Sequence, residues 1–157
     1  MPLSDTIASV LRNAIAHLAE RAIPVFTLAL YFDHESSAVS VCADTEESSI
    51  RLVASMNKYN TQHFHNAVSA ADIKMASLWQ ANIGRSLSLG DFAVVNLCRT
   101  ELPGIAQDDT LFLTMVQGLV AVEADVLSLA AAPEKLLFVC SGKDNEVAYV
   151  WSANSDA

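Results

Sequence analysis

The chain has 157 residues, the size of one ordinary domain with a single hydrophobic core, and we predict one domain over residues 1–157. Hydrophobic residues make up 52% and charged residues 17%, yet no window reaches the roughly 18 uninterrupted apolar residues of a membrane span. The formal net charge of −9 argues against a nucleic-acid-binding protein and against a nucleic-acid partner, because an acidic surface repels phosphate.

The first predicted element is a helix over residues 4–22. Apolar residues recur at helical spacing from Ile7 to Leu18, and Pro24 disfavours helix beyond this stretch. Charged residues interrupt the apolar run, so the segment lacks the apolar core of a signal peptide and we expect a cytoplasmic protein. The interrupting residues are Asp5, Arg12 and Glu20.

Two strands are predicted next. Residues 25–32 are continuously apolar and rich in β-forming residues, which is typical of a strand buried on both faces. Residues 38–43 alternate between apolar and small polar side chains, which is typical of a strand with two different faces. Because only a short polar loop separates them, we predict an antiparallel hairpin with residues 25–32 in the centre of the sheet.

An acidic cluster follows the second strand. Asp44 and Thr45 are residue types that cap helices, and Glu46 and Glu47 come directly after them. The first amides of a helix lack backbone partners, and the helix dipole favours negative charge at that end. We therefore predict that Asp44 or Thr45 is an N-cap and that Glu46 and Glu47 lie in the first helical turn.

The middle of the chain has a weaker pattern, interrupted by glycines. We predict helical segments near residues 59–70, 76–83 and 91–100. Asp108 or Asp109 then caps a long amphipathic helix that Pro133 ends.

Two further strands are predicted at residues 136–140 and 147–151, joined by a turn. The chain thus begins with a helix and a hairpin and closes with a helix and a hairpin. This order predicts the α+β class, with a mainly antiparallel sheet built from the two hairpins and packed against several helices. The alternation of strands and helices typical of doubly wound folds is missing, and no glycine-rich phosphate loop follows an early strand.

Histidines and cysteines were considered as metal ligands. His63 and His65 would share a face on a strand but point apart on a helix, and the surrounding sequence is helical. The three cysteines are widely spaced in apolar runs, without a CxxC pattern, and we interpret them as buried free thiols. We predict no metal site and no cofactor. The cysteines are Cys42, Cys98 and Cys140.

No recognisable catalytic motif is present. Asp33, His34 and Glu35 could support proton transfer, but the sequence places no nucleophile beside them. Cys98 could pair with one of the four histidines, although spacing alone does not establish contact. We therefore assign no catalytic residue.

Two tryptophans are candidate contact residues. Trp79 lies in a segment with polar neighbours, and Trp151 lies near the end of the last predicted strand. Exposed tryptophans are frequent anchors of protein interfaces, while partial burial in the core is the alternative.

Several short motifs resemble a known family. The strand FTLALYFD, a second strand ending in ADTEES, a middle segment with Trp79, a long helix and the closing stretch LLFVCSGKDNEVAYVWSAN resemble the bacterial domain-of-unknown-function family 4303. Asp44 stands where that family usually has Asn. The resemblance implies a small bacterial α+β protein without established catalytic residues. Small acidic domains of this kind are often suspected antitoxin or immunity partners, and the resemblance suggests such a role by analogy only.

The function we predict is that of a non-enzymatic binding protein, of the immunity or antitoxin type, with an acidic contact face. Residues 100–157 carry two lysines against nine acids, a balance of −7, which favours a protein partner with a basic surface. The many apolar residues also favour a homodimer that buries at least about 1,200 Å² in total.

The alternative is a small-ligand-binding domain or an enzyme. Its pocket would lie between the sheet and the helices, with Tyr31, Asp33 and the segment 44–47 at the mouth. Our candidate binding residues are therefore Tyr31, Asp33, Asp44, Glu46, Glu47, Trp79 and Trp151.

Overall fold

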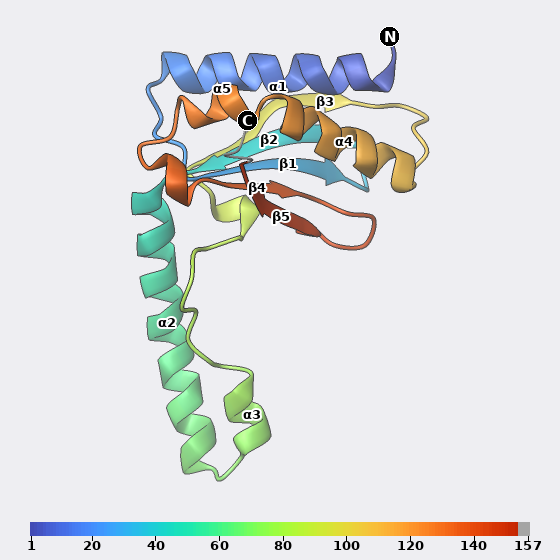
Figure 1. Ribbon diagram of the computed structural model, residues 1–157. Coiled ribbons are helices and arrows are strands. Elements are labelled where there is room, and N and C mark those ends of the chain that lie inside the picture. The colour runs from blue at the N-terminus through green and yellow to red at the C-terminus, as the bar shows by residue number, and fades with distance from the viewer. Residues whose placement is uncertain (154–157) are drawn as a thin grey trace. The chain divides into compact units, whose positions relative to one another are not determined.

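The computed structural model of the protein describes residues 1–153 and has the α+β architecture that we predicted (Figure 1). Its internal contacts form two compact units. Unit 1 consists of Met1–Glu46 and Leu89–Ala157, and unit 2 is the intervening segment Glu47–Ser88. Asn154, the last residue of the motifs that resemble family 4303, lies outside the described residues.

Unit 1 is organised around a five-stranded sheet in the order β3-β2-β1-β4-β5. β1 pairs antiparallel with β2 and parallel with β4, while β3 and β5 form the two edges of the sheet. The prediction of a central strand at residues 25–32 is therefore confirmed. The strands are β1 (Thr27–Asp33), β2 (Ala38–Asp44), β3 (Val94–Glu101), β4 (Leu137–Cys140) and β5 (Tyr149–Ser152).

The sheet differs from the predicted mainly antiparallel sheet of two hairpins. β1 and β4 run parallel, with Leu28 opposite Phe138, so the sheet is mixed. Burial patterns indicate which faces of a strand are covered but not the direction of its neighbour, and the sequence therefore did not reveal this pairing. A fifth strand, β3, is also present on the far side of β2.

The prediction of a helix near residues 91–100 is wrong, because most of this segment is β3. The register with β2 shifts twice, and Asn96 and Cys98 both have positive φ angles, of 53° and 55°. These bulges interrupt the alternation of side chains along the strand. The apolar residues at 94, 95, 97 and 98 consequently have a spacing that resembles a helix.

Three helices belong to the core of unit 1: α1 (Leu3–Glu20), α4 (Asp109–Ala121) and α5 (Glu123–Leu127). α1 and α4 contact each other and the same face of the sheet, as Figure 1 shows. Their buried side chains meet the alternate strand residues Leu28, Leu30 and Phe32 in one cluster. α4 approaches α1 closely at Gly118, where a Cβ atom would lie 2.6 Å from Ile7 Cγ2.

The long helix predicted after Asp108 is interrupted. The Asp108 side chain does accept hydrogen bonds from the amides of Thr110 and Leu111, at 3.0 and 3.3 Å, so its role as an N-cap is confirmed. α4 ends at Ala121, however, because Val122 has ψ near 8° and leaves the helical conformation. A short helix, α5, and a 3-10 turn, η2 (Pro133–Lys135), complete the connection to β4.

Unit 2 is a helical hairpin followed by an irregular return segment. α2 (Glu46–Ser69) begins in unit 1 at its first residue, and α3 (Ile73–Ser77) follows a tight turn. The helix predicted at 59–70 is thus part of a longer one. The predicted helix at 76–83 is wrong beyond residue 77, because residues 80–86 follow an irregular course that side chains of α2 hold.

These side-chain contacts replace the hydrogen bonds of a regular helix. The Asn57 side chain donates to the carbonyl oxygen of Asn82 at 3.0 Å and accepts from its amide at 2.8 Å. The Ser49 hydroxyl accepts from the amide of Ser86 at 2.9 Å. A short 3-10 turn, η1 (Leu89–Asp91), then leads into β3. Within residues 1–153, no helix combines the length and apolarity that crossing a membrane requires.

Candidate functional site

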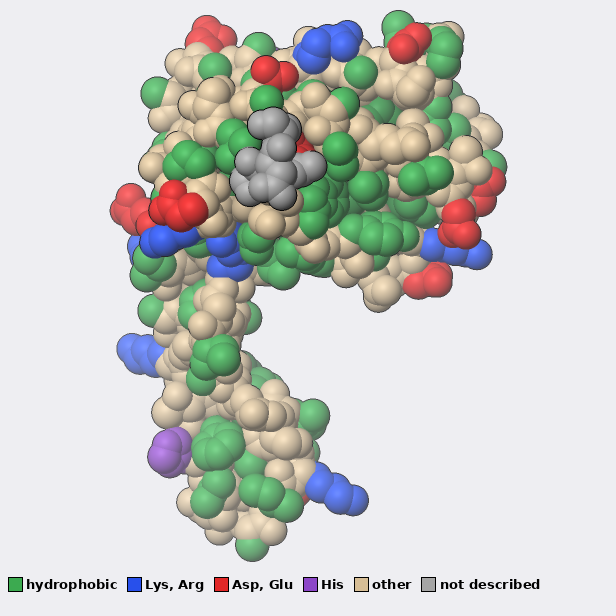
Figure 2. Space-filling model, viewed as in Figure 1, with side chains coloured by type: hydrophobic (Ala, Val, Ile, Leu, Met, Phe, Trp, Pro, Cys, Tyr) green, Lys and Arg blue, Asp and Glu red, His purple; other side chains and the backbone are tan. Residues whose placement is uncertain are grey.

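Unit 2 leaves most of its apolar side chains exposed to solvent. Its only buried apolar residues are Ala67 and Ala76, although eight of the fourteen large exposed hydrophobic residues of the described chain belong to it. Figure 2 shows hydrophobic side chains over α3 and the adjoining end of α2. We name the most prominent group the hairpin surface. It consists of Tyr59, Ile73, Met75, Leu78, Trp79 and Ile83.

The aromatic rings of Tyr59, His63 and Trp79 form a cluster. Tyr59 and Trp79 belong to the hairpin surface, and His63 lies beside it. Trp79 stacks on His63 with ring centroids 4.4 Å apart and an interplanar angle of 23°. Tyr59 contacts both rings, at 4.4 Å from His63 and 5.8 Å from Trp79. The stacking fixes the orientation of Trp79, a sequence-predicted contact residue, while part of its surface remains accessible.

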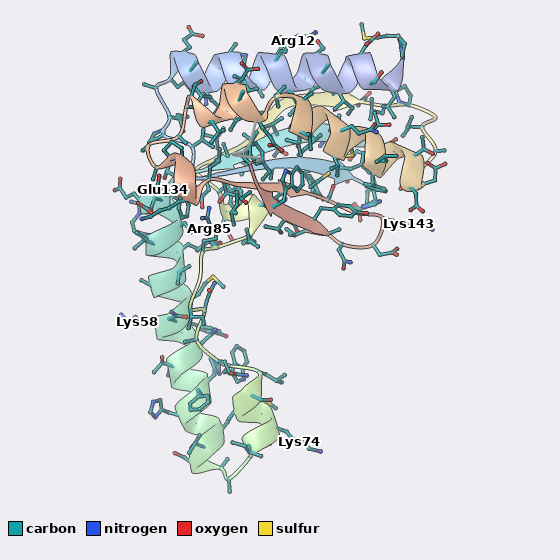
Figure 3. The ribbon with its side chains drawn as sticks, viewed as in Figure 1. Arg12, Lys58, Lys74, Arg85, Glu134 and Lys143 are labelled. Atoms are coloured by element: carbon teal, nitrogen blue, oxygen red, sulfur yellow. The ribbon has the colours of Figure 1, made fainter. Side chains whose placement is uncertain are left out.

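The two units carry opposite formal charges. Unit 2 has four basic residues against Glu47 and Asp72, a charge of +2, so the total of −9 leaves −11 for unit 1. Lys58 extends from α2 and Lys74 from α3, each away from the other helix (Figure 3). Unit 2 therefore presents cations together with apolar side chains. The basic residues are Arg51, Lys58, Lys74 and Arg85.

A second candidate site is a cavity of about 240 Å³ in unit 1. Tyr31 and Cys42 line it, and they alternate with core residues along β1 and β2. Because successive side chains of a strand point to opposite faces, the cavity lies on the face of the sheet opposite the core helices. Its other lining residues are Leu89, Gly90, Val95, Asn96 and Glu146, and we call it the Tyr31 cavity.

The electrostatic environment of the Tyr31 cavity is negative. Burial raises the pKa of Tyr31, and the nearby carboxylates of Asp33, Glu146 and Glu35 raise it further. Burial also raises the pKa of the Cys42 thiol, against a hydrogen bond from the Asn96 backbone. A neutral thiol is a poor nucleophile, so the cavity is suited to binding and not to covalent catalysis.

Asp33 lies outside the lining of the Tyr31 cavity and organises the turn between β1 and β2. Its carboxylate accepts the Ser36 hydroxyl at 2.7 Å and the amides of Glu35 and Ser36, and it pairs with Arg99 at 3.2 Å. Chiefly through the Ser36 hydroxyl, these contacts lower the pKa of Asp33 to about 2. A strong local role thus accounts for this predicted site residue.

His34 is separated from the Asp33 carboxylate by its own contacts. Its ring packs edge-on against Phe32, with centroids 5.3 Å apart. The two ring nitrogens lie 3.1 Å from the side-chain oxygen of Gln107 and 3.1 Å from the carbonyl oxygen of Gly142. His34 therefore joins the turn to two distant loops and forms no proton-transfer pair with Asp33.

The acidic cluster does not converge on the Tyr31 cavity. Asp44 is buried in β2 and accepts the Ala93 amide through Oδ1 at 3.1 Å, so its carboxylate binds the segment before β3, and the prediction that Asp44 or Thr45 caps α2 now rests on Thr45. Thr45 occupies the position before α2, and Glu46 and Glu47 begin that helix as predicted. Glu46 pairs with Lys135 at 3.2 Å at the surface.

Trp151 belongs to the core side of β5. Its ring stacks on Phe138 with centroids 5.9 Å apart, and its Nε1–H donates to Glu123 Oε2 at 3.0 Å. Glu123 is itself buried at the start of α5. The structure therefore gives Trp151 a packing role within unit 1.

Another hollow of unit 1 is an open groove of about 530 Å³ between α1 and the edge strand β3. Cys98 and His17 both line it, which is the pairing that a thiol–imidazole site needs. Burial raises the pKa of the Cys98 thiol, however, and no hydrogen bond joins these two side chains in the described part of the chain. The groove therefore shows no activated nucleophile.

Metal binding finds no support in the arrangement of side chains. His63 and His65 lie on α2, where residues two apart point in different directions. Among residues 1–153, no three His, Cys, Asp or Glu side chains lie in a group that could hold a metal ion.

Sequence reasoning named Tyr31 and Trp79 but missed the residues around them. Asn96 and Glu146 come from a bulged strand and a surface turn, and no local pattern marks either as a site residue. The exposed residues Ile73, Leu78 and Ile83 carried a usable signal, since they are large apolar residues in a segment whose overall pattern is weak.

Comparisons with known proteins were made for the whole chain. No protein-family model, no curated protein and no solved structure matches it. The resemblance to family 4303 therefore stays a prediction.

Proposed function

We propose that this chain is a non-enzymatic protein-binding domain whose contact surface is the hairpin surface. The observation that carries the proposal is the exposure of Ile83, Ile73 and Leu78, at 100%, 76% and 70%. Soluble proteins rarely expose several large apolar side chains within one short segment unless another molecule covers them.

The weak core of unit 2 supports the same proposal. Hairpins of this kind gain most of their stability from packing of apolar faces, because isolated helices are marginal in water. Unit 2 buries only two alanines among its apolar residues, so its own packing contributes little. Covering Leu78, Trp79 and Ile83 with a partner would add the buried apolar area that the hairpin lacks.

The partner that we infer is a second copy of this chain. The hairpin surface is accompanied by the +2 charge of unit 2, and unit 1 carries −11. A contact between unit 2 of one copy and unit 1 of another joins opposite charges, which favours association and fixes the orientation of the partners. In this arrangement, unit 1 serves as the predicted acidic contact face and unit 2 of the other copy serves as the predicted basic partner surface. The resulting complex is the predicted homodimer.

Sedimentation equilibrium across the micromolar range tests this proposal. We expect a dimer whose affinity falls as salt is raised, because the opposite charges are screened. Replacing Leu78 and Ile83 by Ser should weaken dimerisation at least about tenfold, the effect of losing roughly 1.4 kcal/mol. Lys74→Glu should weaken it further.

Ile50→Ser is the matched control, because Ile50 is 63% exposed on α2 of the same unit and lies outside the hairpin surface. It should leave the dimer unchanged. A monomer at every concentration would overturn the self-association. A dimer that is indifferent to the Leu78 and Ile83 changes would overturn the hairpin surface.

A foreign partner is the remaining outcome of the test. An immunity-type role predicts that a basic protein binds the acidic unit 1. Capture of one purified basic protein with equal affinity by the original chain and by the Leu78→Ser, Ile83→Ser variant would assign the contact to unit 1. That result would replace our proposal.

A further inference from the structure

We propose that the Tyr31 cavity binds a small organic cation, such as a quaternary or primary ammonium compound. The inference is independent of the hairpin surface, because every residue that lines the cavity belongs to unit 1. It rests on how the sheet forms the cavity, on the charges around it and on the chemistry of its walls.

The bulges of β3 form one side of the cavity. The β2 residues that have a partner in β3 are Ala38, Val39, Val41 and Ala43, so Ser40 and Cys42 have no directly paired residue there. Val95 and Asn96 occupy the bulge between the pairs Val41–Leu97 and Ala43–Val94. Two β3 residues, Val95 and Asn96, thus lie opposite one β2 residue, Cys42. Both β3 residues line the cavity.

The backbone of this wall is strained. Asn96 has a φ angle of 53°, in the left-handed region that residues other than glycine rarely adopt. Strained residues of this kind gather at binding and catalytic sites. Ser40, which lies opposite Tyr31 on the neighbouring strand, adds a second unusual feature: its buried hydroxyl has no hydrogen-bond partner among the described residues.

The charges near the cavity favour a cation. Asp33 is neutralised by Arg99 at 3.2 Å, but Glu146 has no ion pair or hydrogen bond within residues 1–153. No lysine or arginine lines the cavity. Figure 3 shows Lys143 in the loop between β4 and β5, and this lysine is absent from the lining. One uncompensated carboxylate matches one positive charge.

The walls favour an organic cation over a metal ion. Leu89 and Val95 are apolar, and the Tyr31 ring offers a π face, which attracts ammonium groups. A hard metal ion requires several oxygen ligands, and the lining has a single carboxylate. A volume of about 240 Å³ lies below the about 300–1,000 Å³ typical of pockets for drug-sized ligands. The cavity therefore fits only a small molecule.

Two probes of nearly equal shape test the charge requirement. Choline carries a trimethylammonium group, and 3,3-dimethyl-1-butanol carries an uncharged tert-butyl group in its place. Titration of each probe into the ¹⁵N-labelled full chain should shift the amides of Val95, Asn96 and Glu146. We expect choline to bind at least tenfold more tightly than the neutral probe, and less tightly at high salt.

Variants assign the binding to named groups. Glu146→Gln should reduce choline affinity to that of the neutral probe, and Tyr31→Leu should reduce it, whereas Tyr31→Phe keeps the ring and should preserve it. Asp144→Asn is the matched control, because Asp144 is an exposed acid of the same loop that does not line the cavity. Unchanged amide spectra outside the cavity confirm that each variant is folded.

The remaining outcomes overturn the inference. Equal affinity for choline and the neutral probe would mean a merely apolar cavity. Absence of choline shifts at tens of millimolar would mean no cation site. Loss of choline affinity in Asp144→Asn equal to that in Glu146→Gln would mean a diffuse response to net charge.

Discussion

The two units of this chain differ in how their apolar side chains are used. Unit 1 packs the faces of α1, α4 and the sheet into one cluster, and Leu11, Leu30 and Leu119 are all completely buried. Unit 2 also has large apolar side chains, but it leaves them exposed to solvent, and Leu78 is 70% exposed. The difference indicates that the fold resides in unit 1, whereas the apolar residues of unit 2 are available for contacts with other molecules.

Hydrogen bonding shows the same division. Backbone ladders join all five strands of unit 1. In unit 2, the return segment is held by side chains such as Asn57 and Ser49. Elements with few buried contacts open at low free energy, so unit 2 is expected to exchange its amide hydrogens faster than unit 1.

Removing equivalent leucines from the two units should have very different costs. Leu119→Ala creates a cavity in the core and should lower the free energy of unfolding by about 2–5 kcal/mol. Leu78→Ala removes an exposed side chain and should change it by no more than about 0.5 kcal/mol in the dilute monomer. Urea denaturation followed by circular dichroism measures both. Equal losses would show that the hairpin has a core of its own.

Adding a methyl group at the contact between α1 and α4 should also be costly. In Gly118→Ala, the new Cβ lies 2.6 Å from Ile7 Cγ2, and overpacking of this kind costs about 1–3 kcal/mol. Alanine regains about 1 kcal/mol of helix propensity, so a net loss of up to about 2 kcal/mol is expected. Gly90→Ala is the control, because no atom lies within 4 Å of its Cβ position. Denaturation that showed Gly118→Ala to be stabilising would contradict the close packing of these helices.

Removing a helix N-cap in each unit gives a second comparison, with smaller expected losses of stability. Asp108 caps α4, and its replacement by Ala should cost about 0.5–2 kcal/mol of stability. Asp72 caps the five-residue helix α3 by accepting the Met75 amide at 3.0 Å. Because α3 contributes little to the core, Asp72→Ala should leave the unfolding midpoint unchanged and accelerate only the local exchange of amide hydrogens. A large global loss in Asp72→Ala would contradict our account of unit 2.

The parts of the fold that could be predicted are those where burial leaves a regular pattern. The helical spacing from Ile7 to Leu18 matches α1, and the apolar run at residues 25–32 matches the central strand. Asp108 could be recognised because a cap residue precedes an apolar helical stripe. In each case the pattern of buried and exposed side chains stays the same from one end of the helix or strand to the other.

The parts that could not be predicted depend on contacts between distant segments. β3 lost its alternation to the bulges at Asn96 and Cys98, and its apolar spacing therefore resembled a helix. Residues 80–86 owe their course to Asn57, about twenty-five positions away in the chain. The Tyr31 cavity combines residues of five separate segments, so Glu146 and Asn96 had no local signal to identify them.

The smallest expected effect concerns the turn after β1. The hydroxyl of Ser36, the backbone amides and Arg99 hold the pKa of Asp33 at about 2, below its ordinary value of 3.8. A carboxyl with a lowered pKa in the folded state stabilises the fold above pH 3.8, and this contribution disappears as the pH falls from about 4 to about 2. Asp33→Asn should therefore be slightly less stable than the original chain at pH 6 and equally stable near pH 2. Urea denaturation at the two pH values measures the difference, and carbon-detected NMR titration measures the pKa directly. Since the Ser36 hydroxyl is the largest cause of the shift, Ser36→Ala should raise the pKa of Asp33 more than Arg99→Gln does. The reverse order would show that the ion pair, and not the turn, organises this end of the sheet.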